Sequence, residues 1–398
     1  TVLVADDKGG GSVILPGSNG SDLATEDFGS TDVVARVKRE IGLSFVGMLF
    51  TDREAQGDVG SGGGGDAHNR VIGPDFQWRM SATDFVSGQL LYSSTRTPDR
   101  PDLADEWNGQ HLSGHAADAQ WQHSTTHLDA YAEYKDISDG FRANGGFVPQ
   151  VGVRETIGGG GWTIRPKGFL SRMRTFINYD RQADRSGNLI SRDVQPGAGM
   201  DTPMSGFMQF RYIDDKILAG DELIGRRQFG FVGQFSPSRH FPQIGGDLRS
   251  GEEIDFDNAR PGHGTTINLN ARVNATQHLE LALVQSQRWL NVDDASGNDQ
   301  RLFTAWVSRV KATYVFTSRL FVRGIAQYVS TTRDPSLYLD EVTRKSGTFG
   351  GSALLAYKLN WQSVMFIGYG DDRELTDQER LVPSDRQFFV KVSYAFQR

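Results

Sequence analysis

One unit recurs along most of this chain: two segments of alternating apolar and polar residues joined by a tight turn, with a longer polar loop before the next unit. The turns recur at intervals of about forty residues, enough for two membrane-length strands and one loop. This repeating pattern predicts paired antiparallel strands. The nine turns are expected near Ile41-Gly42, Ser81-Thr83, Ser124-Thr125, Arg165-Lys167, Thr202-Pro203, Ser236-Ser238, Ala275-Gln277, Thr317-Ser318 and Asn360.

The alternation is clear in the segment from Thr265 to Val273. Ile267 and Leu269 fall on one face of an extended strand, while Asn268 and Asn270 fall on the other. Side chains of a strand alternate with period 2, so each such segment has one apolar and one polar face. No segment shows a convincing amphipathic helical pattern, and the chain is therefore predicted to be all-β.

Composition decides which kinds of all-β protein remain. The mean hydropathy of −0.44 and the lack of a long apolar run exclude transmembrane helices. A membrane-spanning strand needs only about 9 to 11 alternating residues, so half of its side chains can be polar. The net charge of −7 argues against binding of nucleic acid, and the absence of cysteine excludes a disulfide framework and thiol catalysis.

Loop lengths give the expected orientation. Short turns on one side and long polar loops on the other are typical of bacterial outer-membrane barrels, with periplasmic turns and extracellular loops. We therefore predict a transmembrane antiparallel up-and-down β-barrel in the bacterial outer membrane, in contact with outer-membrane lipid and with both termini periplasmic.

The strand count follows from the turns. The nine hairpins supply eighteen strands, the C-terminal segment adds one, and an even number requires another before Asp32. Gly11 to Leu15 is the candidate, with Gly17 to Gly29 as its outer loop. The prediction is about 20 strands, or 18 if the Gly- and Pro-rich region from Asn188 to Gln209 forms no full hairpin. Residues 1–398 are treated as one domain, with 1–30 an N-terminal segment and 31–398 the main barrel.

Several segments carry a resemblance to a known family. They are Val34 to Gly42, Asn69 to Phe76, Phe141 to Glu155 and the terminal FVKVSYAF. These segments resemble the C-terminal region of a domain-of-unknown-function family of large exported bacterial proteins. The resemblance implies an outer-membrane barrel and, in the full-length members, an N-terminal domain similar to family 9 carbohydrate-binding modules. Gln150 departs from the arginine expected after GFVP.

Charged residues of the alternating segments are expected to face the lumen, because an ionised side chain facing lipid costs about 2 to 4 kcal/mol at the midplane. Two readings of this set remain open. The cations pair with the carboxylates to fill the interior with ion pairs, or the lumen is partly open and its excess cations favour anionic solutes. The predicted lumen-lining residues are Arg36, Lys38, Asp75, Arg79, Asp129, Glu133, Arg172, Arg174, Arg211, Arg226, Arg272, Glu280, Arg288, Arg309, Lys311, Arg319, Arg323 and Lys391.

The C-terminal segment RQFFVKVSYAFQR is predicted to be the strand that closes the barrel, by pairing with the first strand near Gly11 to Leu15 or with Asp32 to Arg39, which removes the last open edge. Lys391 would then face the lumen. The residues expected to face lipid on this strand are Phe388, Val390, Val392, Tyr394 and Phe396.

Motifs for catalysis and metal binding are missing from the sequence. There is no His-Glu-x-x-His and no Gly-x-Ser-x-Gly. His123 and His127 straddle a predicted turn without a carboxylate in register, so they are interpreted as ordinary turn residues. No catalytic residue, metal site or cofactor is predicted.

These observations favour a channel or uptake pore for small or saccharide-like solutes. The alternative is a non-conducting membrane anchor or scaffold that holds a periplasmic domain or a periplasmic or surface partner protein. A hydrolase is the weakest hypothesis, because no constellation of residues supports it.

Overall fold

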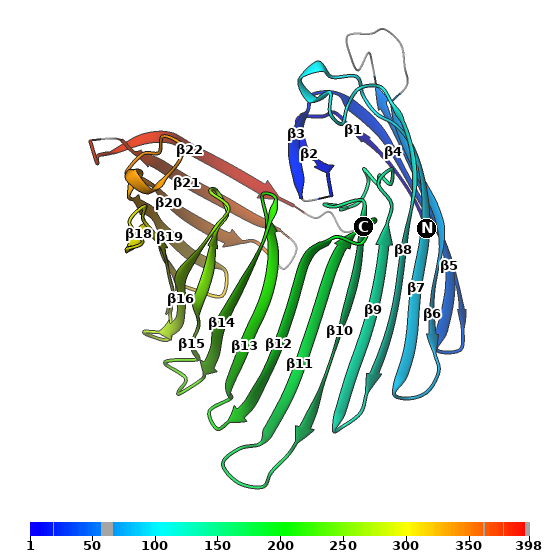
Figure 1. Ribbon diagram of the computed structural model, residues 1–398. Coiled ribbons are helices and arrows are strands. Elements are labelled where there is room, and N and C mark those ends of the chain that lie inside the picture. The colour runs from blue at the N-terminus through cyan, green and yellow to red at the C-terminus, as the bar shows by residue number, and fades with distance from the viewer. Residues whose placement is uncertain (19, 57–66, 361–362, 377, 395–398) are drawn as a thin grey trace. The chain divides into compact units, whose positions relative to one another are not determined.

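The structure is a computed structural model that describes residues 1–18, 20–56, 67–360, 363–376 and 378–394 of the 398 (Figure 1). Strands dominate, and the helices in these ranges are two single 3-10 turns, η1 (Pro101–Leu103) and η2 (Pro335–Leu337). No helix in the described ranges is long and apolar enough to cross a membrane. The strands are β1 (Val2–Asp7), β2 (Gly11–Pro16), β3 (Ser21–Glu26), β4 (Gly29–Ile41), β5 (Ser44–Gln56), β6 (His68–Arg79), β7 (Asp84–Arg96), β8 (His111–Ser124), β9 (Leu128–Ile137), β10 (Val153–Ile164), β11 (Arg172–Asp184), β12 (Leu189–Thr202), β13 (Gly206–Ala219), β14 (Glu222–Phe235), β15 (Gln243–Asp255), β16 (Arg260–Asn274), β17 (Leu279–Asp293), β18 (Asp299–Val315), β19 (Leu320–Arg333), β20 (Lys345–Lys358), β21 (Val364–Leu375) and β22 (Leu381–Ser393).

The chain divides into two compact units. Unit 1 contains Thr1–Thr163, Phe176–Val194 and Asp215–Leu218, and unit 2 contains the rest. Strands β1 to β9 belong wholly to unit 1, as does β10 except for its last residue, and β14 to β22 belong to unit 2; the residues of β11, β12 and β13 are divided between the units.

In unit 1 the strands follow one another as an antiparallel meander. β1 pairs with β4, and each strand from β4 to β9 pairs with the next along the chain, up to β10. Directly opposed residues of an antiparallel pair lie on the same face of the sheet. The register can therefore be followed across neighbouring strands, and one row of the polar face reads Lys38, Gly47, Asp75, Gln89, Asp118, Lys135 and Glu155.

Unit 2 continues in the same manner from β14 to β22, where each strand again pairs with its successor. Its two faces differ in chemistry. One row of the polar face reads Gln243, Arg272, Ala282, Lys311, Ile325, Ser352, Gly370 and Gln387. A row of the opposite, apolar face reads Leu279, Tyr314, Val322, Leu355, Ile367 and Val390.

All nine predicted turns are confirmed, since each lies at or within two residues of a break between consecutive strands. The region from Asn188 to Gln209 forms β12 and the start of β13, joined by a turn at Pro203 to Ser205. The large sheet has 20 strands, which favours the higher of the two predicted counts.

The prediction of the first strand was wrong. Gly11–Pro16 is a strand, but it pairs with β3 in a separate two-stranded sheet, and the strand that pairs with β4 is Val2–Asp7. The segment expected to be an outer loop, Gly17 to Gly29, contains β3. The physical reason lies in long-range packing, because Leu15 and Ala24 of this hairpin are buried against Trp107 rather than displayed on a sheet edge.

Five of the short turns share one local hydrogen-bond arrangement. A Thr or Ser hydroxyl accepts a hydrogen bond from the backbone N–H three residues later, which in four of the five is the first residue of the next strand. The N–H to oxygen distances are 3.0 Å at Ser81, 2.9 Å at Thr125, 3.2 Å at Ser238, 3.0 Å at Thr276 and 3.1 Å at Thr317.

Candidate functional site: the polar face and its cap

The predicted lumen-lining residues of unit 1 lie on one face of its sheet. Lys38 and Asp75 occupy the same row, Arg36 is two residues from Lys38 on β4, and Arg79 is four residues from Asp75 on β6. Asp129 and Glu133 of β9 have the same alternation as Lys135 of that row. That this polar face lines a lumen stays a prediction.

Lys135 is the centre of a charged cluster that sequence reasoning missed. Its Nζ lies 3.0 Å from Glu133 and 3.1 Å from Glu155, and Asp118 is directly opposite on β8. The ammonium group neutralises two carboxylates that would otherwise repel each other. The signal available in the sequence was the spacing of Glu133 and Lys135, which puts both on one face of a strand.

The polar face of unit 2 holds most of the remaining predicted residues. Arg272, Glu280, Arg288, Arg309, Lys311, Arg323 and Lys391 all fall on this face by register. Arg226 contacts Glu253 there, and the side chain of Arg211 lies over Gly230, where a Cβ would be 2.8 Å from it. Arg172 and Arg174 alternate with Met173 at the start of β11, and Arg172 pairs with Asp201 at 2.8 Å.

Arg319 was predicted wrongly as a strand residue. It is the last residue of the turn before β19, where its backbone carbonyl accepts a hydrogen bond from Lys358 at 2.8 Å. The hydroxyl of Thr317 accepts from the Arg319 N–H at 3.2 Å, so the turn extends to this residue. Alternation alone does not show where a turn ends.

Several cations on the polar face of unit 2 have no carboxylate partner in the part of the chain that the structure describes. Arg272 lies 4.0 Å from Glu280, but Arg309, Lys311 and Arg323 form no ion pair among the described residues. Arg309 and Lys311 are two residues apart on β18, so they are about 7 Å apart along the strand. Arg323 is opposite Thr313 and thus diagonal to Lys311. These three residues form the cation patch, a surface of positive potential.

The C-terminal strand has the two faces that its alternation predicts. Phe388, Val390 and Val392 share the apolar face with Tyr369, Ile367 and Met365, while Lys391 lies opposite Phe366 on the polar face. Tyr394 follows the end of β22, and Phe396 lies outside the described residues. The expected contact with lipid, and the pairing with the first strand, stay predictions.

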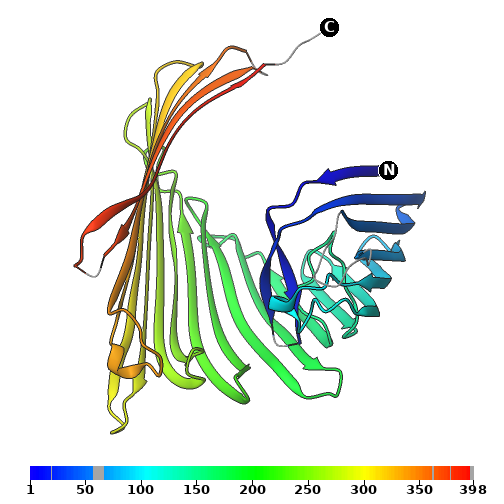
Figure 2. The same ribbon diagram turned by 90° about the horizontal axis from the view of Figure 1, so that it is seen from above.

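The long-loop end of unit 1 is covered by a cap, defined as residues 8–18 and 20–28, 97–110 and 138–152. Figure 2 shows the dark-blue β2–β3 hairpin beside the cyan loop of η1. Leu15, Ala24 and Trp107 form a buried cluster with Val13, Phe28 and Leu103 packed around it. This small apolar core, rather than the sheet, is where the hairpin gains its stability.

The cap is fastened to the polar face by buried polar contacts. Asn69 of β6 donates to Thr95 of β7 and to the Arg142 carbonyl, both at 2.8 Å, and accepts from the Asn144 N–H at 2.8 Å. The Arg142 N–H donates to Ser93 at 3.0 Å. Both N–H donors and the oxygen of this buried amide have a partner, and two of the three bonds hold the 138–152 loop against β6.

Ion pairs join the parts of the cap. Arg142 donates two hydrogen bonds to the Glu106 carboxylate, one from Nε and one from Nη2, the second at 2.9 Å. The two side chains are only 9% and 18% exposed. Arg53 of β5 contacts Glu26 of β3. Gln150 accepts from Gln182 at 2.8 Å, which makes a polar link to β11.

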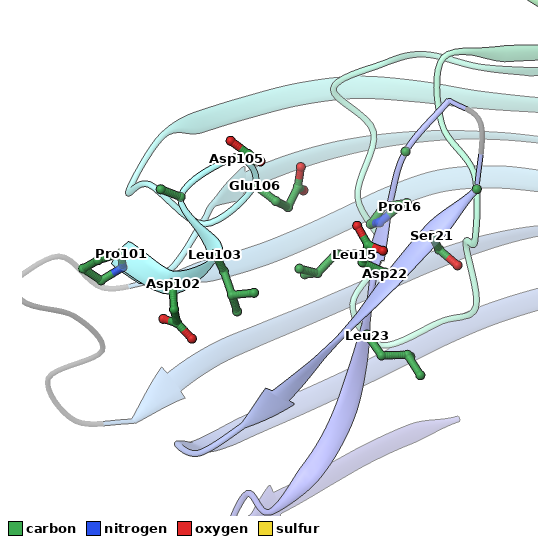
Figure 3. Close-up of a pocket in the computed structure, with 13 residues that line it drawn as sticks. Leu15, Pro16, Ser21, Asp22, Leu23, Pro101, Asp102, Leu103, Asp105 and Glu106 are labelled. Carbon is green, nitrogen blue, oxygen red and sulfur yellow. The ribbon is translucent and has the colours of Figure 1, made fainter. Parts of the chain in front are cut away.

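A cleft of about 920 Å³ lies between the hairpin and the η1 loop (Figure 3). Its walls carry Asp22 from β3 and Asp102, Asp105 and Glu106 from the η1 loop. Arg100 pairs with Asp102 at 2.7 Å, and this ion pair lowers the pKa of the Asp102 carboxyl. Nowhere in the described part of the chain do three His, Cys, Asp or Glu side chains gather as a metal site.

His123 has a carboxylate partner that the sequence did not reveal. Its Nδ1 lies 2.8 Å from Asp84, at the start of β7, and its ring stacks on Trp121 with centroids 6.2 Å apart. His127 instead contacts the Thr163 carbonyl at 3.0 Å. The two histidines are therefore held by different neighbouring hairpins and do not form a common site.

The fold is similar to solved iron-transporter structures. The FrpB iron transporter from Neisseria meningitidis, F5-1 variant in its apoprotein form, superimposes with a TM-score of 0.52 at 11% identity and covers 98% of this chain and 79% of its own. The F3-3 variant of the same transporter gives a TM-score of 0.50 at 11% identity, with the same coverage of 98% and 79%. At this identity the likeness concerns the fold.

No protein-family model matches the sequence, and no curated protein matches it. The sheet of 20 antiparallel strands with a polar and an apolar face, together with these structural neighbours, defines the fold class: a transmembrane, antiparallel, up-and-down β-barrel.

Proposed function

We propose that this protein is an outer-membrane uptake barrel for small anionic solutes. The observation that carries the proposal is the cation patch: Arg309, Lys311 and Arg323 share the polar face of unit 2 and form no ion pair among the described residues. Unpaired cations in a wet passage attract anions and lower the barrier to their entry.

The proposal extends to saccharide-like solutes that carry an acidic group. Aromatic rings accompany the cations on the polar face, with Arg288 at 5.7 Å from the Phe303 ring and Lys358 at 6.0 Å from the Phe321 ring. A ring offers an apolar surface to a sugar, while the neighbouring cation binds its carboxylate or phosphate. The iron-transporter neighbours fit an uptake role in general.

The experiment is ion selectivity in planar bilayers. The full chain is purified in detergent, inserted, and its reversal potential is measured in a salt gradient. We expect conductance steps with preference for chloride over potassium. Replacing Arg309, Lys311 and Arg323 together with glutamine should lower that preference by roughly threefold or more, because three of the attracting charges are lost.

A control variant changes the net charge equally elsewhere. Lys8, Arg344 and Arg380 lie in loops between strands, and their replacement by glutamine should leave the selectivity unchanged. If the parent chain shows no conductance, or if both variants change selectivity equally, the proposal is wrong.

The cap supports a second candidate, the non-conducting anchor or scaffold. It packs on the polar face of unit 1 through Asn69 and Arg53, which is where a passage would have to open. A sealed parent chain that copurifies with a stoichiometric periplasmic or surface partner would favour this function over uptake.

A further inference from the structure

Unit 2 has a cleft of about 480 Å³ at its rim, the end of the sheet where short turns join the strands. It lies between the turn 236–242 and the turn 275–278. Its cationic and imidazole side chains are Arg239, His240 and His278, and its single carboxylate is Glu280. Glu280 is 4.0 Å from Arg272, which offsets its charge.

His278 is held in a fixed orientation. Its Nδ1 contacts the Val315 carbonyl at 2.9 Å, and its backbone carbonyl accepts from the Val315 N–H at 2.8 Å. Its ring lies against Tyr314 with centroids 6.1 Å apart. Nδ1 is thus occupied, and Nε2 is the nitrogen that remains for a ligand.

Asn274 fixes the other wall of the cleft. Its N–H donates to the His240 carbonyl at 2.8 Å, its Nδ2 donates to the Arg239 carbonyl at 2.8 Å, and its carbonyl contacts His240 Nδ1 at 3.2 Å. These three contacts with Asn274 hold Arg239 and His240 at the rim. The Arg239 guanidinium forms no ion pair within the described ranges.

The apolar face beside this cleft ends in exposed aromatic rings. Tyr314 and Phe316 are 40% and 52% exposed, and their ring centroids are 4.7 Å apart. Amphipathic rings at the ends of membrane strands lie at headgroup level. A cationic cleft beside such rings is placed to meet the phosphate of a lipid whose chains cover the apolar face.

The arrangement recurs at a turn of unit 1. His127 Nδ1 contacts the Thr163 carbonyl at 3.0 Å, the Thr163 N–H donates to the His127 carbonyl at 2.7 Å, and the ring stacks on Trp162 at 6.1 Å. The same carbonyl-held imidazole stacked on an aromatic ring of the apolar face therefore occurs in both units.

We propose that the rim cleft binds the phosphate group of an anionic phospholipid headgroup. Arg239 donates to two phosphate oxygens, and protonated His278 donates from Nε2 to the third, while Tyr314 and Phe316 contact the glycerol backbone and upper acyl chains. Charge-assisted hydrogen bonds of this kind are the strong ones, and the guanidinium fork matches phosphate geometry.

Native mass spectrometry of the full chain in detergent tests the proposal. The probes are phosphatidylglycerol and phosphatidylcholine with identical acyl chains. The parent chain should retain phosphatidylglycerol about tenfold better, and the double variant R239Q/H278Q should reduce that ratio to near one. Glutamine at 278 keeps a donor for the Val315 carbonyl, and heat-modifiable gel migration checks that the variant folds.

Matched control substitutions lie at the other ends of the strands. His111→Gln and Arg344→Gln remove an imidazole and a guanidinium near the long loops and should leave the ratio unchanged. Equal retention of both lipids by the parent, or the same loss in the control variant, would overturn the proposal. Binding of inorganic phosphate by the parent chain with no retention of phosphatidylglycerol would also overturn it, since the site would then take free phosphate rather than lipid.

Discussion

Arg36 of β4 reaches past Gly47 of β5 to pair with the buried carboxylate of Asp75 on β6. Gly47 is the residue directly opposite both Lys38 and Asp75, and a Cβ there would lie 2.5 Å from Asp75 Oδ1. The missing side chain is what lets two charged residues two strands apart meet on the polar face.

Gly47→Ala should therefore displace the Asp75 carboxylate and weaken its pair with Arg36. We expect the free energy of unfolding to fall by about 1 kcal/mol, because Asp75 is buried while Arg36 is half exposed and remains solvated. Urea titration of the barrel folded into lipid vesicles measures this. Gly324→Ala is the matched control: its Cβ meets nothing within 4 Å, so it should be neutral or slightly stabilising.

Arg142→Ala should release the cap. The substitution removes both hydrogen bonds that Arg142 donates to the largely buried Glu106 carboxylate, which costs about 3 kcal/mol. Hydrogen exchange of residues 11–26 should speed up, and single-channel conductance should rise if the uptake proposal holds. Arg100→Ala breaks only exposed pairs with Asp27 and Asp102 and should change exchange little. Unchanged exchange in Arg142→Ala would show that the apolar cluster alone holds the hairpin.

The cap should dock more tightly at mildly acidic pH. Burial raises the pKa of the Glu26 carboxyl above 4.5, and this effect exceeds the opposing attraction of Arg53. The Glu26 carboxyl therefore takes up its proton at a higher pH in the docked state than in the undocked state. Lowering the pH through the docked-state pKa favours docking. Exchange of the β2–β3 amides, corrected for intrinsic rates, should be slower at pH 4.5 than at pH 7. Glu26→Gln should abolish the difference, and a persistent difference in that variant would assign it to another group.

Thr276→Val should weaken a short turn. The substitution keeps the shape of the side chain but removes the hydroxyl that accepts from the Leu279 N–H at 3.0 Å and from the His278 N–H at 3.1 Å. A loss of about 1 kcal/mol in unfolding free energy is expected from urea titration. Thr348→Val on β20, whose hydroxyl makes no side-chain hydrogen bond among the described residues, should have little effect.

Local patterns predicted most of the large sheet. The alternation from Leu279 to Trp289 and from Leu320 to Val329 depends only on residues next to one another, and the structure has strands at both places. The short turns were found for the same reason, since a Thr or Ser hydroxyl such as that of Thr125 acts within four residues.

Alternation placed the charged residues of β17, β18 and β19 on one face, and the register of these strands agrees, while Arg319 lies in a turn. Which of them pair could not be predicted, because a partner lies one or two strands away and depends on register. Asp84 and His123 are 39 residues apart, and only the pairing of β7 with β8 brings them together.

The sequence by itself determined that this chain alternates with period 2, turns at nine places and presents a charged and an apolar face, because each of these properties is local. Tertiary structure alone decided that Val2–Asp7 rather than Gly11–Pro16 joins the large sheet, and that the β2–β3 hairpin packs on Trp107 as part of a cap. A short strand can pair with any free edge, and the choice is made by the burial of side chains that lie far along the chain from it.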